Sequence, residues 1–211
     1  MENSHENKAL AFERLLFFSD AVFAIVITLL VLEIKVPKIG HDEMSEALLR
    51  EKLIELLPSM FGFVFSFFIV GMLWIEHHRL FRFIKDYDFG LVSRNLIFLL
   101  TVAFVPFPTA LFSEYFRSKT AFILYSLSFA IAALGKLWVW RYAVKNRAQL
   151  MTGETTDEII KQITRRSLAV PITCTVTIIL CIFIGPAAGF VFPFIPLIAN
   201  LLYRKKKEVP V

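Results

Sequence analysis

Long apolar stretches alternate with short charged segments along most of this chain. Each stretch has close to the roughly 20 residues with which a helix crosses the hydrocarbon core of a bilayer. We therefore expect an all-α integral membrane protein, with residues 1–211 forming a single transmembrane domain. The pattern predicts six transmembrane helices, over residues 15–34, 58–76, 90–112, 120–140, 168–186 and 188–203.

The last predicted span is the shortest. The run Gly185-Pro186-Ala187-Ala188-Gly189 separates it from the fifth, so these two spans are expected to form a tight helical hairpin. The alternative is one long broken segment, which would give five spans in total.

Residues 42–57 follow a different pattern, because leucines recur at helical spacing among charged residues. This pattern predicts an amphipathic helix on the external surface. Pro58 follows it and is expected to open the second span, since proline suits the first turn of a helix.

Composition and charge support a membrane protein over a nucleic-acid-binding one. The chain is 57% hydrophobic, whereas soluble domains are nearer 45–50%. The formal net charge is +5, but most basic residues lie beside the ends of predicted spans, so we expect no nucleic-acid partner. With six spans, most Lys and Arg fall on the side of both termini. The positive-inside rule then predicts a multi-pass protein of the cell membrane with both termini in the cytoplasm.

The first predicted span begins with three polar side chains, Arg14, Ser19 and Asp20. An acid within a span is costly and usually faces protein or water, so Asp20 is expected to have a partner. The alternative is that Ser19 or Asp20 caps the start of a helix.

Polar residues of the next two spans are expected at the same depth. Trp74 and His78 are four residues apart and share a helical face, while His77 points to another side. Asn95 lies one turn inside the third span. A hydrogen-bonded cluster that joins the first three spans would satisfy Asp20 where hydrocarbon cannot.

These polar groups could instead form a metal or catalytic site, or a proton relay. Asp20, Glu76, His77 and His78 could form a metal or catalytic site, although adjacent histidines on a helix diverge by about 100° and suit one ion poorly. The proton relay is the alternative, since histidine titrates in the physiological range.

A second face of the first span carries Ile25, Thr28, Leu29 and Leu32, at the spacing i, i+3, i+4 and i+7. Asp20 lies on a different stripe of the same helix. An Ile and Leu stripe is by itself typical of helix packing or lipid contact.

The residues of the first span resemble those of a known family. The run Arg14-x-x-x-Phe18-Ser19-Asp20, continued by Ala-Val-Phe-Ala, is similar to the first helix of prokaryotic members of the transmembrane protein 175 family of potassium channels. The segments around Trp74, around Asn95 and over residues 106–109 are also similar. The resemblance is densest over residues 14–110.

The resemblance implies a homotetramer of six-span subunits in which the first helix of each subunit lines a central pore for K+, with no cofactor. It implies that Ile25 forms the constriction, with Thr28, Leu29 and Leu32 on the same face. It also implies that the motif Arg, Ser and Asp hold the first helix in place through Trp and His of the second span and Asn of the third.

A pore of this kind would work without a ring of backbone carbonyls. Four Ile25 side chains would form a hydrophobic gate that closes by dewetting. Four Thr28 hydroxyls would replace part of the water shell of an ion. Because flexible side chains impose size weakly, we expect only a modest preference for potassium over sodium.

Two competing functions are considered. The first is a proton-coupled or cation-coupled secondary transporter that uses Asp20 and His78, against which the sequence shows no inverted repeat. The second is an enzyme built on Glu76, His77 and His78. Since no nucleophile–base pair or metal-ligand spacing accompanies these residues, we do not expect an enzyme.

Overall fold

The computed structural model describes residues 2–185, and within them the chain is helical, with a single isolated β-bridge between Ile84 and Met151. Five helical segments of this part are long and apolar enough to cross a membrane. They are α1 (Glu2–Leu29) with the 3-10 helix η1 (Leu30–Glu33), α3 (Leu57–Phe81), α4 (Phe89–Ala103) with α5 (Pro106–Glu114), α6 (Lys119–Lys145) and α8 (Asp157–Ile184). The predicted sixth span, 188–203, lies outside the described residues.

Three short helices complete this part of the chain. They are η2 (His41–Glu43), α2 (Glu46–Glu55) and α7 (Arg147–Leu150). Within residues 42–57, where an amphipathic helix is predicted, the structure has the shorter helix α2, which buries none of its side chains. It begins where the Ser45 hydroxyl accepts a hydrogen bond from the backbone N–H of Leu48.

Several helices are longer than the predicted spans. α3 continues to Phe81 instead of residue 76, and α6 to Lys145 instead of residue 140. α8 begins at Asp157 instead of residue 168, after the Thr156 hydroxyl caps it by accepting from Ile159 N–H. Hydropathy detects only the part of a helix that suits hydrocarbon. Backbone hydrogen bonding continues beyond that part, because a capped polar turn is stable in water.

The third predicted span, 90–112, is two helices. α4 ends at Ala103 and α5 begins at Pro106, so the break lies directly before Pro106 and Pro108. Proline lacks the N–H that would continue the hydrogen bonding of α4, so the chain turns before it resumes as a helix.

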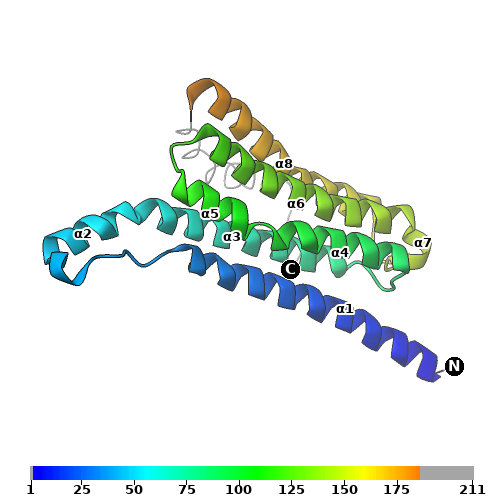
Figure 1. Cartoon of the computed structure of the whole chain (residues 1–211). Helices are drawn as coiled ribbons and strands as arrows, with labels where there is room; N and C mark the ends of the chain where they lie inside the picture. Colours follow the sequence, from blue (N-terminus) through cyan, green and yellow to red (C-terminus); the bar gives the residue numbers. More distant parts are fainter. Residues whose placement is uncertain (1, 186–211) are drawn as a thin grey trace.

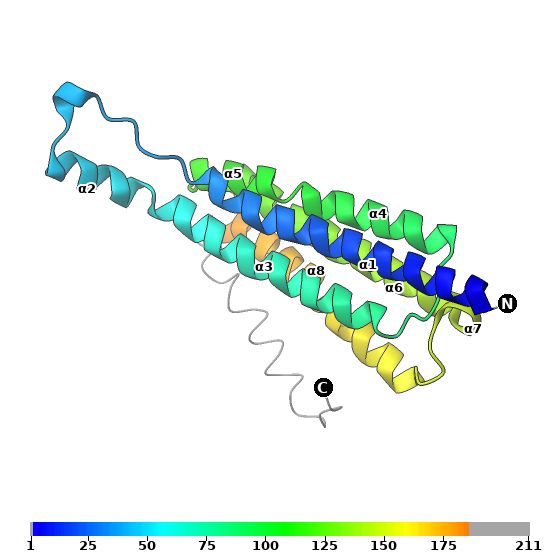
Figure 2. The same cartoon turned by 90° about the horizontal axis from the view of Figure 1, so that it is seen from below.

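The helices form a bundle in which α1 lies at one side (Figures 1 and 2). α1 packs on α3 and α4, whereas α6 and α8 form the most extensive helix pair on the side away from α1. The N-terminus lies at one end of the bundle, here called the N-terminal end. The connection after η1 and helix α2 extend beyond the other end, and α2 has no buried side chain.

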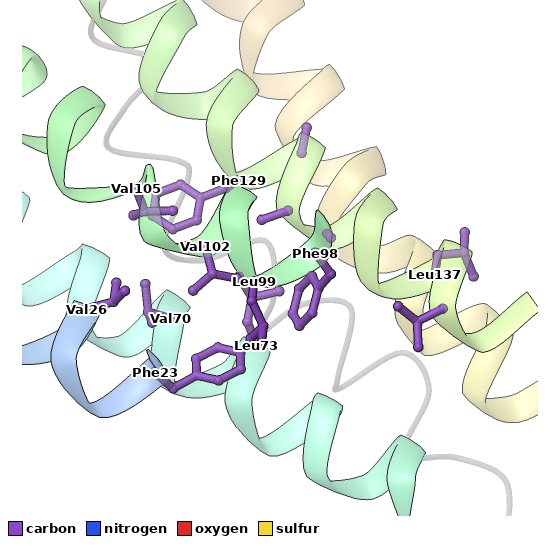
Figure 3. Packing of buried hydrophobic residues seen from close by; sticks show 14 of the residues in the cluster. Phe23, Val26, Val70, Leu73, Phe98, Leu99, Val102, Val105, Phe129 and Leu137 are labelled. Atoms are coloured by element: carbon purple, nitrogen blue, oxygen red, sulfur yellow. The ribbon is translucent and has the colours of Figure 1, made fainter. Parts of the chain in front are cut away.

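The core between α1, α3 and α4 is built from large apolar side chains. Phe23 and Val26 of α1 point toward Val70 and Leu73 of α3, with Phe98 of α4 beside them (Figure 3). This packing fixes which face of α1 is turned toward its own subunit.

Candidate functional site in the first helix

The face of α1 and η1 that packs against the rest of the subunit is defined by Ser19, Phe23, Val26 and Leu30. These residues follow the spacing i, i+4, i+7 and i+11 and are at most 2% exposed. Ser19 is the polar member of this stripe, so its hydroxyl must find partners inside the protein.

Ser19 is part of a hydrogen-bonded chain that crosses three helices. Its hydroxyl donates to the Leu15 carbonyl at 2.9 Å and accepts from the Asn95 side-chain amide at 2.9 Å. The Asn95 side-chain oxygen lies 2.9 Å from Nε2 of His77. Because that oxygen can only accept, Nε2 of His77 must carry the proton and donate it.

The chain of Ser19, Asn95 and His77 is shielded from solvent, since each of the three is at most 1% exposed. The ring of His77 packs against Phe81, Phe98 and Phe23, with ring centroids 4.5, 5.4 and 5.7 Å away. In such apolar surroundings a hydrogen bond is stronger and an unpaired polar group is costly. This polar chain therefore fixes both the depth and the rotation of α1 against α3 and α4.

Asp20 makes a second link between α1 and α3, because the indole N–H of Trp74 donates to its carboxylate at 2.8 Å. Asp20 is half-buried and Trp74 lies at the exposed edge of the contact. The interpretation of Ser19 or Asp20 as a helix cap is wrong, because α1 begins at Glu2 and both residues lie within it.

Two residues of the predicted cluster lie apart from it. Arg14 is exposed on α1, and in residues 2–185 no hydrogen bond or ion pair joins its side chain to the others. His78 is exposed, with its ring centroid 6.0 Å from that of Trp74. Trp74 thus neighbours both Asp20 and His78, and in the part of the chain that the structure describes no hydrogen bond joins these two groups.

The four residues considered for a metal or catalytic site turn to different partners. Glu76 forms ion pairs with Arg79 at 3.2 Å and with Lys136 at 3.7 Å, while His77 faces Asn95 and Asp20 faces Trp74. Over the described residues, no three His, Cys, Asp or Glu side chains gather closely enough to hold a metal ion.

The Glu76–Lys136 ion pair is a feature that the sequence interpretation missed. Lys136 lies on α6 and is 2% exposed, so the pair joins α3 to α6 within the bundle. Its signal in the sequence is a lysine inside an apolar stretch, which requires a partner when buried.

The opposite side of α1 is uncovered. Ile25, Leu29 and Leu32 are 58%, 41% and 69% exposed, and Thr28 is exposed between them. Leu32 lies in η1, whose tighter winding shifts it from the position that a continuous α-helix would give it. The described part of one subunit therefore presents an apolar row, interrupted by a hydroxyl, that none of its other helices covers.

The hydroxyl of Thr28 is oriented by its own helix. Its hydrogen is directed to the backbone carbonyls of Ile25 and Ala24, with oxygen–oxygen distances of 2.8 and 3.0 Å. Since the hydrogen is used in this way, the hydroxyl oxygen is left as an acceptor on the exposed face. An oxygen of this kind is a suitable ligand for a hard cation.

Comparisons with known proteins match the region that holds this site. The family model described as endosomal/lysosomal potassium channel TMEM175 matches residues 14–106. A protein of Streptomyces collinus named potassium channel is 41% identical over 128 residues, which covers 58% of this chain and 60% of that protein. One of Chamaesiphon minutus, also named potassium channel, is 38% identical over 151 residues, covering 69% of this chain and 73% of that protein.

A solved structure shares the fold. It is the crystal structure of a lysosomal potassium-selective channel TMEM175 homolog from Chamaesiphon minutus, with a TM-score of 0.75 and 32% sequence identity. The match covers 90% of this chain and 98% of that chain. The likeness thus includes the whole bundle as well as the first helix.

Proposed function

This chain belongs to the TMEM175 family, and we propose that it is a potassium-selective channel that conducts K+ passively across the cell membrane. The bacterial relatives named potassium channel and the solved potassium-selective homolog support this function. The observation that carries the proposal is the division of α1 into two faces. One face is anchored by buried polar contacts, and the other is an uncovered apolar row that contains a threonine.

The proposed assembly is a homotetramer of six-span subunits with both termini in the cytoplasm. One uncovered helix face encloses no pore, but four copies around a central axis enclose one. The exposed row of Ile25, Thr28, Leu29 and Leu32 then faces the axis, and the Ser19 face holds each helix to its own subunit. Exposed apolar residues arranged in one row on α1 are what such an assembly would use.

The proposed gate is made of the apolar side chains. Rings of Ile25, Leu29 and Leu32 would exclude water from a narrow pore, and a small tilt or rotation of the helices would readmit it. The Thr28 ring would supply oxygen ligands in place of water. Because the polar chain through Ser19 sets the rotation of α1, it also determines how far these side chains project toward the axis.

Conduction is tested with the purified protein in a planar bilayer under a potassium gradient. A channel gives single-step currents that reverse at the potassium Nernst potential and do not require a proton gradient. Saturating flux that depends on a proton gradient would instead support the carrier that uses Asp20 and His78. The variant His78→Gln separates the two further, since the channel keeps its current.

The role of Thr28 is tested with Thr28→Ala and Thr28→Ser, measured by the permeability ratio of potassium to sodium. Serine keeps the hydroxyl, so its ratio is expected to stay near that of the native protein, whereas alanine lowers it. An unchanged ratio in Thr28→Ala removes the ring from the selectivity mechanism while leaving the channel function in place.

The assembly is tested by amine cross-linking in detergent, where a ladder that ends at four subunits is expected. Its geometry is tested by disulfide formation between single cysteines. Leu32→Cys in η1 should give a covalent dimer, while the control Ile131→Cys, on the exposed face of α6, should not. Dimers from α6 alone would place a different helix at the subunit contact.

A further inference from the structure

The exposed face of α6 changes character along its length. An apolar row at helical spacing consists of Leu127, Ile131, Leu134 and Trp138, and each of these residues is 42–49% exposed. The same face continues with Arg141 and Lys145, both exposed. Where a helix leaves the hydrocarbon and enters the headgroup region of a bilayer, its exposed face typically changes from apolar side chains to a tryptophan and then to basic side chains.

Helix α8 has the basic and apolar parts of this order, without a tryptophan, in the opposite chain direction. Lys161 and Arg165 are exposed near its start, and an exposed apolar row at helical spacing follows them. That row consists of Ile172, Val176, Ile179 and Phe183. Both helices thus carry two basic residues on an otherwise apolar exposed face, and in both, these residues lie at the end of the bundle where the N-terminus lies.

A hydrogen bond sets the two helices side by side at this level. The indole N–H of Trp140 donates to the Thr164 hydroxyl at 3.0 Å. Arg141 follows Trp140 by one residue, and Arg165 follows Thr164 by one residue. Because the helices are antiparallel and helical positions turn by about 100° per residue, Arg141, Lys145, Lys161 and Arg165 project on one outer face within about two helical turns.

The tryptophan beside this cluster is held in place. The guanidinium of Arg94 lies over the Trp138 ring at 4.9 Å and over the Tyr142 ring at 3.9 Å from their centroids. The four basic side chains of the cluster, by contrast, make no hydrogen bond or ion pair within residues 2–185. Their charges are therefore available to a ligand from outside the chain.

Helices α6 and α8, which carry this face, lie on the side of the subunit away from α1 (Figure 1). If α1 surrounds the channel axis, as proposed above, then the outer face of α6 and α8 is turned toward lipid. The ligand that such a face meets is a phospholipid, and a positive cluster complements an anionic headgroup.

We propose that Arg141, Lys145, Lys161 and Arg165 form a binding site for the headgroup phosphate of an anionic phospholipid, with Trp138 at the level of the headgroup. Arginine binds a phosphate through two parallel N–H bonds, and lysine adds a point charge. The acyl chains of the bound lipid lie along the apolar rows of α6 and α8. The location on the outer rim rests on the proposed channel assembly, whereas binding itself is measured without any current.

The test compares lipid binding of three proteins in detergent. They are the native chain, the variant Arg141→Gln/Lys145→Gln/Lys161→Gln/Arg165→Gln, and the control Lys35→Gln/Lys38→Gln/Arg50→Gln/Arg117→Gln. The control removes the same number of arginines and lysines, all exposed, from the opposite end of the bundle. Each protein is titrated with short-chain phosphatidylglycerol, with phosphatidylcholine and with inorganic phosphate, and binding is followed by native mass spectrometry and by the melting temperature.

The native chain is expected to prefer phosphatidylglycerol to phosphatidylcholine. Each basic residue near an anionic headgroup contributes about a fivefold factor in affinity, so the α6–α8 variant should lose at least about tenfold while the control keeps the preference. An equal loss in both variants, or no preference in the native chain, overturns the proposal. Equal affinity for inorganic phosphate would identify a free-anion site and would overturn the lipid assignment.

Two controls distinguish loss of the binding site from loss of the folded state. The melting temperature without added lipid shows whether each variant is folded, and the double variant Arg141→Gln/Arg165→Gln provides a milder change with an expected partial loss. A chain that conducts no potassium but binds phosphatidylglycerol through these residues would refute the channel and keep the lipid site. A chain that conducts potassium but does not bind phosphatidylglycerol through these residues would refute the lipid site and keep the channel.

Discussion

Helices α1 and α6 are both long apolar helices, yet they differ in how much of their surface their own subunit covers. In the most apolar stretch of α1, 22% of the residues are buried, compared with 61% in α6. This stretch of α1 is nevertheless more apolar than the corresponding stretch of α6. Apolar content therefore does not determine which helix lies inside the subunit.

The difference follows from what each helix packs against. α6 is covered by α4, α5 and α8, and even a lysine on it is buried with an ion-pair partner. α1 contacts its subunit along one stripe, and buried polar contacts at Ser19 define that stripe. A helix with little coverage and a specific polar anchor is suited to a role between subunits, whereas α6 is suited to holding one subunit together.

The largest effect on stability is expected in α6. Trp140 is fully buried and donates a hydrogen bond to Thr164, so Trp140→Ala should reduce the free energy of unfolding by about 3–5 kcal/mol. The measurement is reversible unfolding in mixed micelles. The control is Trp138→Ala, which removes a ring that is 43% exposed together with its contact to Arg94, and its cost should stay well below that of Trp140→Ala. Similar losses in both variants would contradict the buried role of α6.

The next effect is expected at the polar anchor of α1. His77→Phe leaves the Asn95 side-chain oxygen buried without a donor, which should cost about 1–3 kcal/mol. The neighbouring His78→Phe changes an exposed ring and should have little effect on unfolding in the same micelles. If the two variants are equally destabilised, the His77–Asn95–Ser19 chain does not hold α1.

A smaller effect is expected at the half-buried link between Trp74 and Asp20. Trp74→Phe removes one hydrogen bond to a carboxylate and should cost about 0.5–1.5 kcal/mol. A double-mutant cycle with Asp20→Ala isolates this contribution, because alanine removes the acceptor. Additive losses in the cycle would show that the two side chains do not interact energetically.

The smallest effect on stability is expected at the uncovered face of α1, where the effect on function should be largest. Ile25→Ala should change the free energy of unfolding by no more than about 0.5 kcal/mol, because the side chain is 58% exposed. It should nevertheless raise the open probability in a bilayer, since the proposed gate loses apolar bulk. Ile131→Ala on α6 removes the same atoms from a residue that is 46% exposed and should leave the current unchanged.

Much of the site could be predicted from the sequence because a polar group buried in hydrocarbon without a hydrogen-bond partner costs several kcal/mol. A serine and an acid at the start of an apolar helix must have partners, and Trp74, His77 and Asn95 are polar groups at the same depth. The structure joins these residues by hydrogen bonds at 2.8–2.9 Å. Helical periodicity also separated the face of Ile25 and Thr28 from that of Asp20.

Other features were decided by packing. Two adjacent histidines are equivalent in sequence, and only the position of α4 selects His77 over His78 as the partner of Asn95. The burial of Lys136 beside Glu76 depends on how α6 lies against α3. The lengths of α3, α6 and α8 depend on caps and neighbours at the bundle end, where hydropathy gives no signal.

The sequence by itself determined that the chain forms apolar helices and that the start of the first one requires polar partners, because both follow from the cost of exposing polar groups to hydrocarbon. The tertiary structure decided which face of that helix is covered and which is left open. Lipid, a pore and a neighbouring helix all accept an isoleucine equally well in terms of hydropathy. The packing of α3 and α4 around Ser19 covers one face of the helix. It leaves Ile25, Thr28, Leu29 and Leu32 exposed, where they can contact whatever lies outside the subunit.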